Sequence, residues 1–173
     1  MIKQLIQALE NVMLDSERLE HLQIHFSEDD QKVRGSKFKS EFIAHSLELV
    51  QYIMQQIQSG NYHLEMDEEE IIVKITEKSQ IVGYDALAKI EDLSEKEKEK
   101  IEWKERFGFK VRCLEKQATE TSQLMTIFRK GNPMVLKTVF PGHYAPAFPN
   151  KSLQTDQEYL KSQSFWNQHV LLT

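Results

Sequence analysis

Apolar residues recur every three to four positions in the first third of the chain. Between residues 2 and 23 they follow the 3.6-residue period of an amphipathic helix. The same period runs through residues 37–58, and Gly60 is a natural C-terminal stop for that second helix. A polar connector of residues 27–36 separates the two segments, so we expect an antiparallel helical hairpin over residues 1–60.

The pattern changes after residue 60. Residues 61–66 and 70–76 are short strand-like runs, the second rich in β-branched side chains, and the acidic residues 67–69 between them predict a turn. Residues 80–84 form another short apolar run. Ser94, with Glu97 three residues later, has the signature of a capping box and predicts a charged, solvent-exposed helix over residues 94–108.

Alternation with a period of two begins near residue 108. The runs 109–113, 124–128 and 135–139 predict a three-stranded antiparallel meander, with Val135, Lys137 and Val139 on one face. Residues 153–172 predict a final helix. The expected fold class is therefore α+β, with the N-terminal helical hairpin packed on an antiparallel sheet of residues 61–173 and both parts in one compact unit.

Composition narrows the class of protein. The chain has 173 residues, of which 40% are apolar, enough to bury a core. No apolar run approaches the roughly 20 residues that span a bilayer, so we expect no membrane partner. The single cysteine, Cys113, excludes an intrachain disulfide and a Cys-rich zinc site, which favours the reducing cytoplasm. Only His21 and His25 have a metal-ligand spacing, without a third ligand, so we expect no metal and no cofactor.

Charge is distributed unevenly. Residues 1–107 hold 14 Lys and Arg against 23 Asp and Glu, whereas residues 108–173 hold 8 against 4. The basic C-terminal part suits contact with a few phosphates, and so RNA is one expected partner. The acidic N-terminal helices would instead suit a basic protein partner.

Most candidate chemistry lies between Ser122 and Pro149, where two strand-like runs flank a tight turn and a Pro-Gly step follows. Cleavage of RNA by attack of the 2′-hydroxyl needs a base, an acid and cations near the phosphorus, and no metal. The candidate catalytic residues are His143, Tyr144, Lys137 and Arg129. The candidate nucleic-acid-binding residues are Lys110, Arg112, Lys130 and Thr138. The same residues also fit an ordinary solvated sheet face followed by a loop.

The segment Thr138-Val139-Phe140-Pro141-Gly142 resembles the end of the C-terminal hairpin in the barnase–EndoU–RelE group of bacterial and phage-associated ribonuclease toxins. The resemblance covers residues 108–150. It implies metal-independent RNA cleavage with Arg129, Lys137, Thr138, His143 and Tyr144 in the site. The upstream histidine or glutamate of many such enzymes is not identified in the sequence. The alternative is a non-enzymatic interaction module, such as an immunity or regulatory protein, that binds through its acidic helices.

Overall fold

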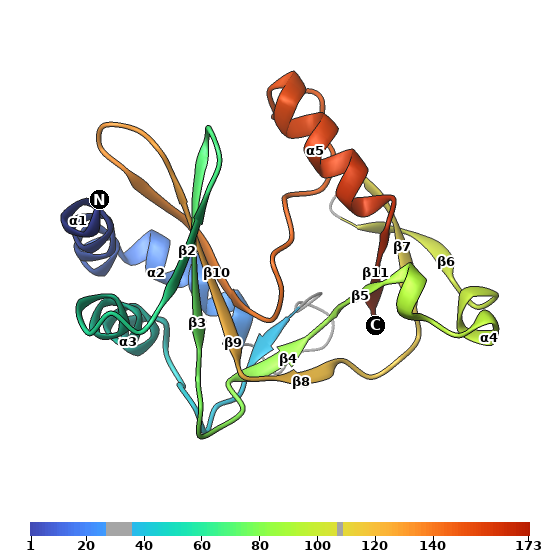
Figure 1. Cartoon of the computed structure of the whole chain (residues 1–173), viewed down its shortest axis with the longest axis horizontal. Helices are drawn as coiled ribbons and strands as arrows, with labels where there is room; N and C mark the ends of the chain where they lie inside the picture. Colours follow the sequence, from blue (N-terminus) through green and yellow to red (C-terminus); the bar gives the residue numbers. More distant parts are fainter. Residues whose placement is uncertain (27–35, 107–108) are drawn as a thin grey trace. The chain divides into compact units, whose positions relative to one another are not determined.

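The computed structural model describes residues 1–26, 36–106 and 109–173 and has an α+β fold (Figure 1). The chain divides into two compact units. Unit 1 comprises residues 1–85 and 120–143, and unit 2 comprises residues 86–119 and 144–173. The division does not follow the expected boundary at residue 60, because each unit pairs strands that are far apart in the sequence: residues 70–76 with 123–129 in unit 1, and residues 87–89 with 169–171 in unit 2. No helix among the described residues is long and apolar enough to span a bilayer.

The helices of unit 1 are α1 (Ile2–Met13), α2 (Ser16–Gln23), the short 3-10 helix η1 (Ile24–Phe26) and α3 (Ser46–Gln58). The expected single helix over residues 2–23 is wrong, since it is interrupted at Leu14 and Asp15. The Asp15 carboxylate accepts a hydrogen bond from the Arg18 N–H and starts α2 as a separate helix. The expected connector lies almost entirely outside the described residues.

The second expected helix is wrong over its first nine residues. Lys37 and Phe38 form strand β1 (Lys37–Phe38), and α3 begins only at Ser46, whose N–H donates to the Gln23 side chain. Phe38 is nevertheless buried in the same core as the apolar face of α3. Phe38 therefore fits the apolar spacing of a helix, although its backbone is extended.

A four-stranded antiparallel sheet has the order β10-β9-β3-β2. Its strands are β2 (His63–Met66), β3 (Glu70–Thr76), β9 (Gln123–Arg129) and β10 (Val135–Pro141). The two early strands and their acidic turn are confirmed. A smaller sheet in the order β1-β4-β8 includes β4 (Gly83–Asp85) and β8 (Thr119–Thr121).

Helices α1 and α3 lie on one face of the four-stranded sheet (Figure 1). Their apolar faces and the facing strand residues form one core, which includes Leu5, Leu9, Ile53, Ile71, Val73, Phe128, Leu136 and Val139. We call the opposite face of this sheet the far face. Because side chains alternate along a strand, residues that neighbour core positions, such as Ile72 between Ile71 and Val73, point to the far face.

The sheet of unit 2 has the order β5-β11-β7-β6, with strands β5 (Leu87–Lys89), β6 (Glu102–Arg106), β7 (Phe109–Leu114) and β11 (His169–Leu172). Its helices are the short η2 (Ile90–Asp92) and α4 (Glu95–Lys98), and α5 (Asp156–Trp166). Here β7 pairs with β6 and β11, so the expected meander is wrong, although β9 and β10 do form a hairpin.

Two expected helices of unit 2 are shorter than predicted. The capping box of Ser94 and Glu97 is confirmed, but α4 ends at Lys98 and the following residues form β6. Alternating Glu and Lys suit either structure, and pairing with β7 selects the strand. The C-terminal helix is confirmed over residues 156–166 only, since residues 169–172 join the sheet as β11.

Candidate functional site

A β-bulge in β10 determines which of its side chains reach the far face. Leu136 pairs with Phe128 and Thr138 pairs with Ile127, so Lys137 is an extra residue between them. Leu136 points into the core, whereas Lys137 and Thr138 both point to the far face. The expectation that Lys137 and Val139 share a face is therefore wrong, because Val139 lies in the core.

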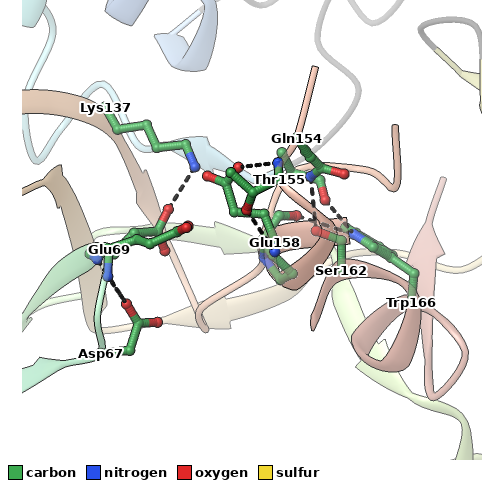
Figure 2. A network of polar contacts seen from close by, with 11 residues as sticks. Asp67, Glu69, Lys137, Gln154, Thr155, Glu158, Ser162 and Trp166 are labelled. Carbon is green, nitrogen blue, oxygen red and sulfur yellow. Dashed lines mark hydrogen bonds and ion pairs between the residues drawn. The ribbon is translucent and has the colours of Figure 1, made fainter. Parts of the chain in front are cut away.

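The bulge aims Lys137 at a carboxylate two strands away. Its ammonium Nζ lies 2.6 Å from Oε1 of Glu70, the first residue of β3, and Figure 2 shows this contact as a dashed line from the labelled lysine. The Glu70 side chain is only 8% exposed and that of Lys137 is 30% exposed. The pair is therefore shielded from water more than an ordinary surface ion pair.

Arg129 lies on β9 between these two residues. It is the direct cross-strand partner of Glu70 on one side and of Val135 on the other. Directly opposed residues have Cβ atoms about 5 Å apart, so the guanidinium shares the far face with the Glu70 carboxylate. We call Glu70, Arg129, Lys137 and Thr138 the sheet-face cluster. Three of its members were candidates from the sequence, and Glu70 was missed because it reads as the end of an acidic turn.

Hydrogen bonds at the adjacent hairpin tips fix the position of this cluster. The Asp67 carboxylate accepts the N–H groups of Glu69 and Glu70, at 2.9 and 2.8 Å. The Lys130 N–H donates to the Glu69 carbonyl at 2.8 Å, and its ammonium donates to the Asp67 carbonyl. Lys130, a candidate for nucleic-acid binding, thus ties the β9–β10 hairpin to the β2–β3 turn.

His143 belongs to a second arrangement in unit 1. Its Nδ1 lies 2.6 Å from Oδ2 of Asp85, and its backbone N–H donates to the same oxygen at 3.0 Å. Asp85 is 5% exposed and His143 is 69% exposed. Because a carboxylate only accepts, Nδ1 donates this hydrogen bond. Asp85 was missed in the sequence, because it follows a short apolar run and belongs to no recognisable motif.

Gly142 makes this arrangement possible. Its φ is +104°, in the region that favours glycine, and an added Cβ would lie 2.4 Å from the Asp85 Cγ. The Pro141-Gly142 step therefore brings the chain directly over the buried carboxylate. The motif noted in the sequence has a structural reason at this position, independent of any catalytic role.

The structure does not bring His143 to the sheet-face cluster. His143 is six positions after Lys137 along β10 and its turn, which corresponds to about 20 Å of extended chain. Arg129 pairs with Val135, the first residue of β10, whereas His143 follows the last residue of that strand. The candidates of unit 1 therefore form two centres, one with the cations and one with the imidazole.

The remaining candidates lie in unit 2. The Tyr144 ring packs edge-on against Phe165, with centroids 6.2 Å apart. Lys110 and Arg112 lie on β7, two residues apart and therefore on one face of that sheet. Lys110 is exposed, and Arg112 donates to the backbone carbonyls of Trp166 and Asn167 at the C-terminal end of α5.

Two clefts in unit 1 have mixed charge. One of about 320 Å³ lies between α2 and β10, and its charged or ionisable lining residues are Glu17, Arg18, His21 and Lys137. The other, of about 450 Å³, is lined by His63, Lys74, Glu77, Lys78 and neighbouring polar residues. Neither is an acidic groove. Among the described residues, no three His, Cys, Asp or Glu side chains are grouped so that they could hold a metal ion.

No known protein family and no curated protein sequence matches this chain. The resemblance to the ribonuclease toxin group therefore stays a prediction, carried by residues 108–150 of the sequence.

Proposed function

We propose that this protein binds RNA and cleaves it without a metal ion, and that the sheet-face cluster is the site. The observation that carries the proposal is the buried Glu70 carboxylate, 2.6 Å from the Lys137 ammonium and opposite Arg129. A carboxylate that can accept a proton and two cations that can stabilise a phosphorane are the groups that this reaction needs.

In the proposed reaction Glu70 accepts the proton of a 2′-hydroxyl, and the 2′-oxygen attacks the neighbouring phosphorus. Arg129 and Lys137 stabilise the negative charge that develops on the phosphoryl oxygens, and the Thr138 hydroxyl donates a further hydrogen bond. The bond from phosphorus to the 5′-oxygen breaks, and that oxygen takes a proton from water. The hydroxide that remains takes up the proton held by Glu70, which restores the carboxylate. The products are a 2′,3′-cyclic phosphate and a 5′-hydroxyl.

The resemblance extends this proposal to the biological class. A protein of the bacterial toxin or phage-associated type acting on RNA would work in the cytoplasm, and the buried Cys113, which forms no disulfide, is consistent with a reducing compartment. His143 has no part in the proposed reaction, because it follows the end of β10 and does not reach the sheet-face cluster. Its bond to Asp85 gives it a structural role at the end of β10.

The test is RNA cleavage by purified protein in EDTA. Glu70→Gln removes the base with little change of shape, and we expect a rate loss of about 10²–10⁴-fold. Lys137→Met should also slow cleavage. Lys74→Met is the matched control, since Lys74 is another lysine paired with a glutamate, Glu65, on the same sheet. That variant should cleave RNA at the wild-type rate.

Two results would contradict the proposal. Wild-type protein that leaves RNA intact between pH 5 and 9, with and without divalent metal, would exclude cleavage. Loss of cleavage in His143→Gln, with Glu70→Gln fully active, would move the chemistry from the sheet-face cluster to the Asp85–His143 pair.

A second candidate function is a non-enzymatic module that binds a basic protein. The observation in its favour is that several cations of unit 1 are already paired with carboxylates, as in Lys39–Glu120 and Lys74–Glu65. The exposed Glu17 and Glu20 on α2 would then contribute to the acidic surface. If RNA does not bind at low salt but oligolysine does, and Glu17→Gln with Glu20→Gln weakens that binding, this function is favoured.

A further inference from the structure

The sheet of unit 2 carries an exposed tryptophan on its edge strand. Trp103 lies on β6, the last strand in the order β5-β11-β7-β6, and is 59% exposed. Single exposed apolar residues are common on protein surfaces, and by itself this one would need no explanation. Its neighbour on the next strand distinguishes it.

Arg112 is directly opposite Trp103 in the β6–β7 register, and its guanidinium carbon lies 4.6 Å from the centre of the indole ring. The same guanidinium donates through Nη1 to the carbonyls of Trp166 and Asn167, at 3.3 and 3.0 Å. These carbonyls belong to the C-terminal end of α5, where backbone acceptors need partners. The guanidinium is therefore fixed, and it supports one face of the indole.

Lys110 completes the patch. It is two residues before Arg112 on β7, so the two side chains share a face, and it is exposed. Glu105 lies opposite Lys110, so the patch also includes a carboxylate. An aromatic ring with adjacent cations is the usual surface for unpaired nucleic acid, because every base has a π-face that can stack. The Glu105 carboxylate offsets part of the positive charge, so base stacking should contribute more to the binding free energy than the cations do.

We infer that Trp103, backed by Arg112, is a stacking site for an unpaired base of single-stranded RNA, with Lys110 near the adjoining phosphate. The inference deepens the proposed function, on which it rests, by naming unpaired RNA as the substrate class. It assigns no catalytic role to unit 2, and it makes binding separable from cleavage.

The probe is 2′-O-methyl hexauridylate, which has no free 2′-hydroxyl and so resists the proposed reaction. Trp103 and Trp166 are the two tryptophans of the chain, so Trp166→Phe makes Trp103 the sole indole emitter. We expect saturable quenching of its fluorescence as the oligonucleotide is added. In protein that retains Trp166, anisotropy of the labelled oligonucleotide should show about tenfold weaker binding for Trp103→Leu, as expected for loss of one stacked base.

Further variants separate stacking from charge. Trp103→Phe keeps an aromatic ring and should lose less affinity than Trp103→Leu. Lys110→Gln should lower the salt dependence of binding by about 0.7 in log–log slope, one phosphate contact on a single strand. Leu160→Ala is the matched control, because Leu160 is an exposed apolar residue of the same unit, and it should bind as wild type does.

The outcomes distinguish this inference from the proposed function. Absence of quenching, or wild-type affinity in Trp103→Leu, overturns the stacking site whatever the cleavage assay shows. Saturable quenching by a protein that never cleaves RNA supports the stacking site and removes the proposed cleavage. Quenching that persists in Glu70→Gln while cleavage is lost supports both.

Discussion

The Glu70–Lys137 ion pair offers a direct test of how rigidly the sheet-face cluster is held. The perturbation is a double-mutant cycle with Glu70→Gln and Lys137→Met, each of which removes charge and keeps most of the side-chain volume. The quantity of interest is the coupling free energy between the two positions, since it cancels the separate effects of each substitution.

Burial sets the expected magnitude. Exposed ion pairs contribute about 0.2–1 kcal/mol, whereas removing one partner of a fully buried pair costs about 3–5 kcal/mol. Glu70 is 8% exposed, Lys137 is 30% exposed, and their charged atoms are 2.6 Å apart. The pair lies between these limits, and we expect a coupling of about 1–2 kcal/mol. For Lys74–Glu65, whose side chains are 33% and 47% exposed, we expect a smaller coupling free energy, because water screens that pair more strongly.

The assay is urea unfolding followed by far-UV circular dichroism. Both tryptophans lie in unit 2, so their fluorescence reports that unit separately and shows whether the two units unfold together. Adding salt gives a second test. Because salt screens exposed charges more than buried ones, it should weaken the Lys74–Glu65 coupling more than the Glu70–Lys137 coupling. A coupling for Glu70 and Lys137 that is no larger than the reference pair's would refute the view that the cluster is preorganised.

Three further predictions concern stability. Ile53→Ala should cost about 2–5 kcal/mol, because Ile53 is fully buried between α3 and the sheet, whereas Leu160→Ala on exposed α5 should cost less than about 0.5 kcal/mol in the same urea titration. Gly142→Ala should cost about 2 kcal/mol or more, since its φ is +104° and the new Cβ would meet Asp85; a cost near zero would show that the turn relaxes freely. Burial lowers the pKa of His25, so the unfolded chain binds more protons and stability should fall as pH drops below about 6.5. His25→Gln should flatten this part of the pH dependence of the urea midpoint, and an unchanged slope would contradict the assignment.

Local patterns in the sequence predicted what a few neighbouring residues can specify. The apolar period identified α1 and most of α3, and the capping box at Ser94 marked the start of α4. The β2–β3 and β9–β10 hairpins followed from their turn residues. In each case the hydrogen bonds and the apolar face that define the element lie within a short stretch of chain.

The candidate site was predicted only in part for the same reason. Arg129, Lys137 and Thr138 lie in one hairpin, so sequence reasoning could place them near one another. Glu70 joins them through the pairing of β3 with β9, across more than fifty residues of sequence, and the bulge that aims Lys137 at it leaves no mark in the apolar pattern. Asp85 likewise meets His143 only through the folded chain.

The sequence by itself determined the α+β class, the amphipathic helices and the two hairpins, because these depend on side-chain periodicity and turn chemistry over short distances. Only the tertiary structure decided that β7 leaves the expected meander, that residues 169–172 form a strand, and that the cations and the imidazole lie in separate centres. Strand partners and bulges are selected by the burial of whole sheet faces. The free energy of that burial depends on residues far apart in the chain, so a local sequence pattern does not predict it.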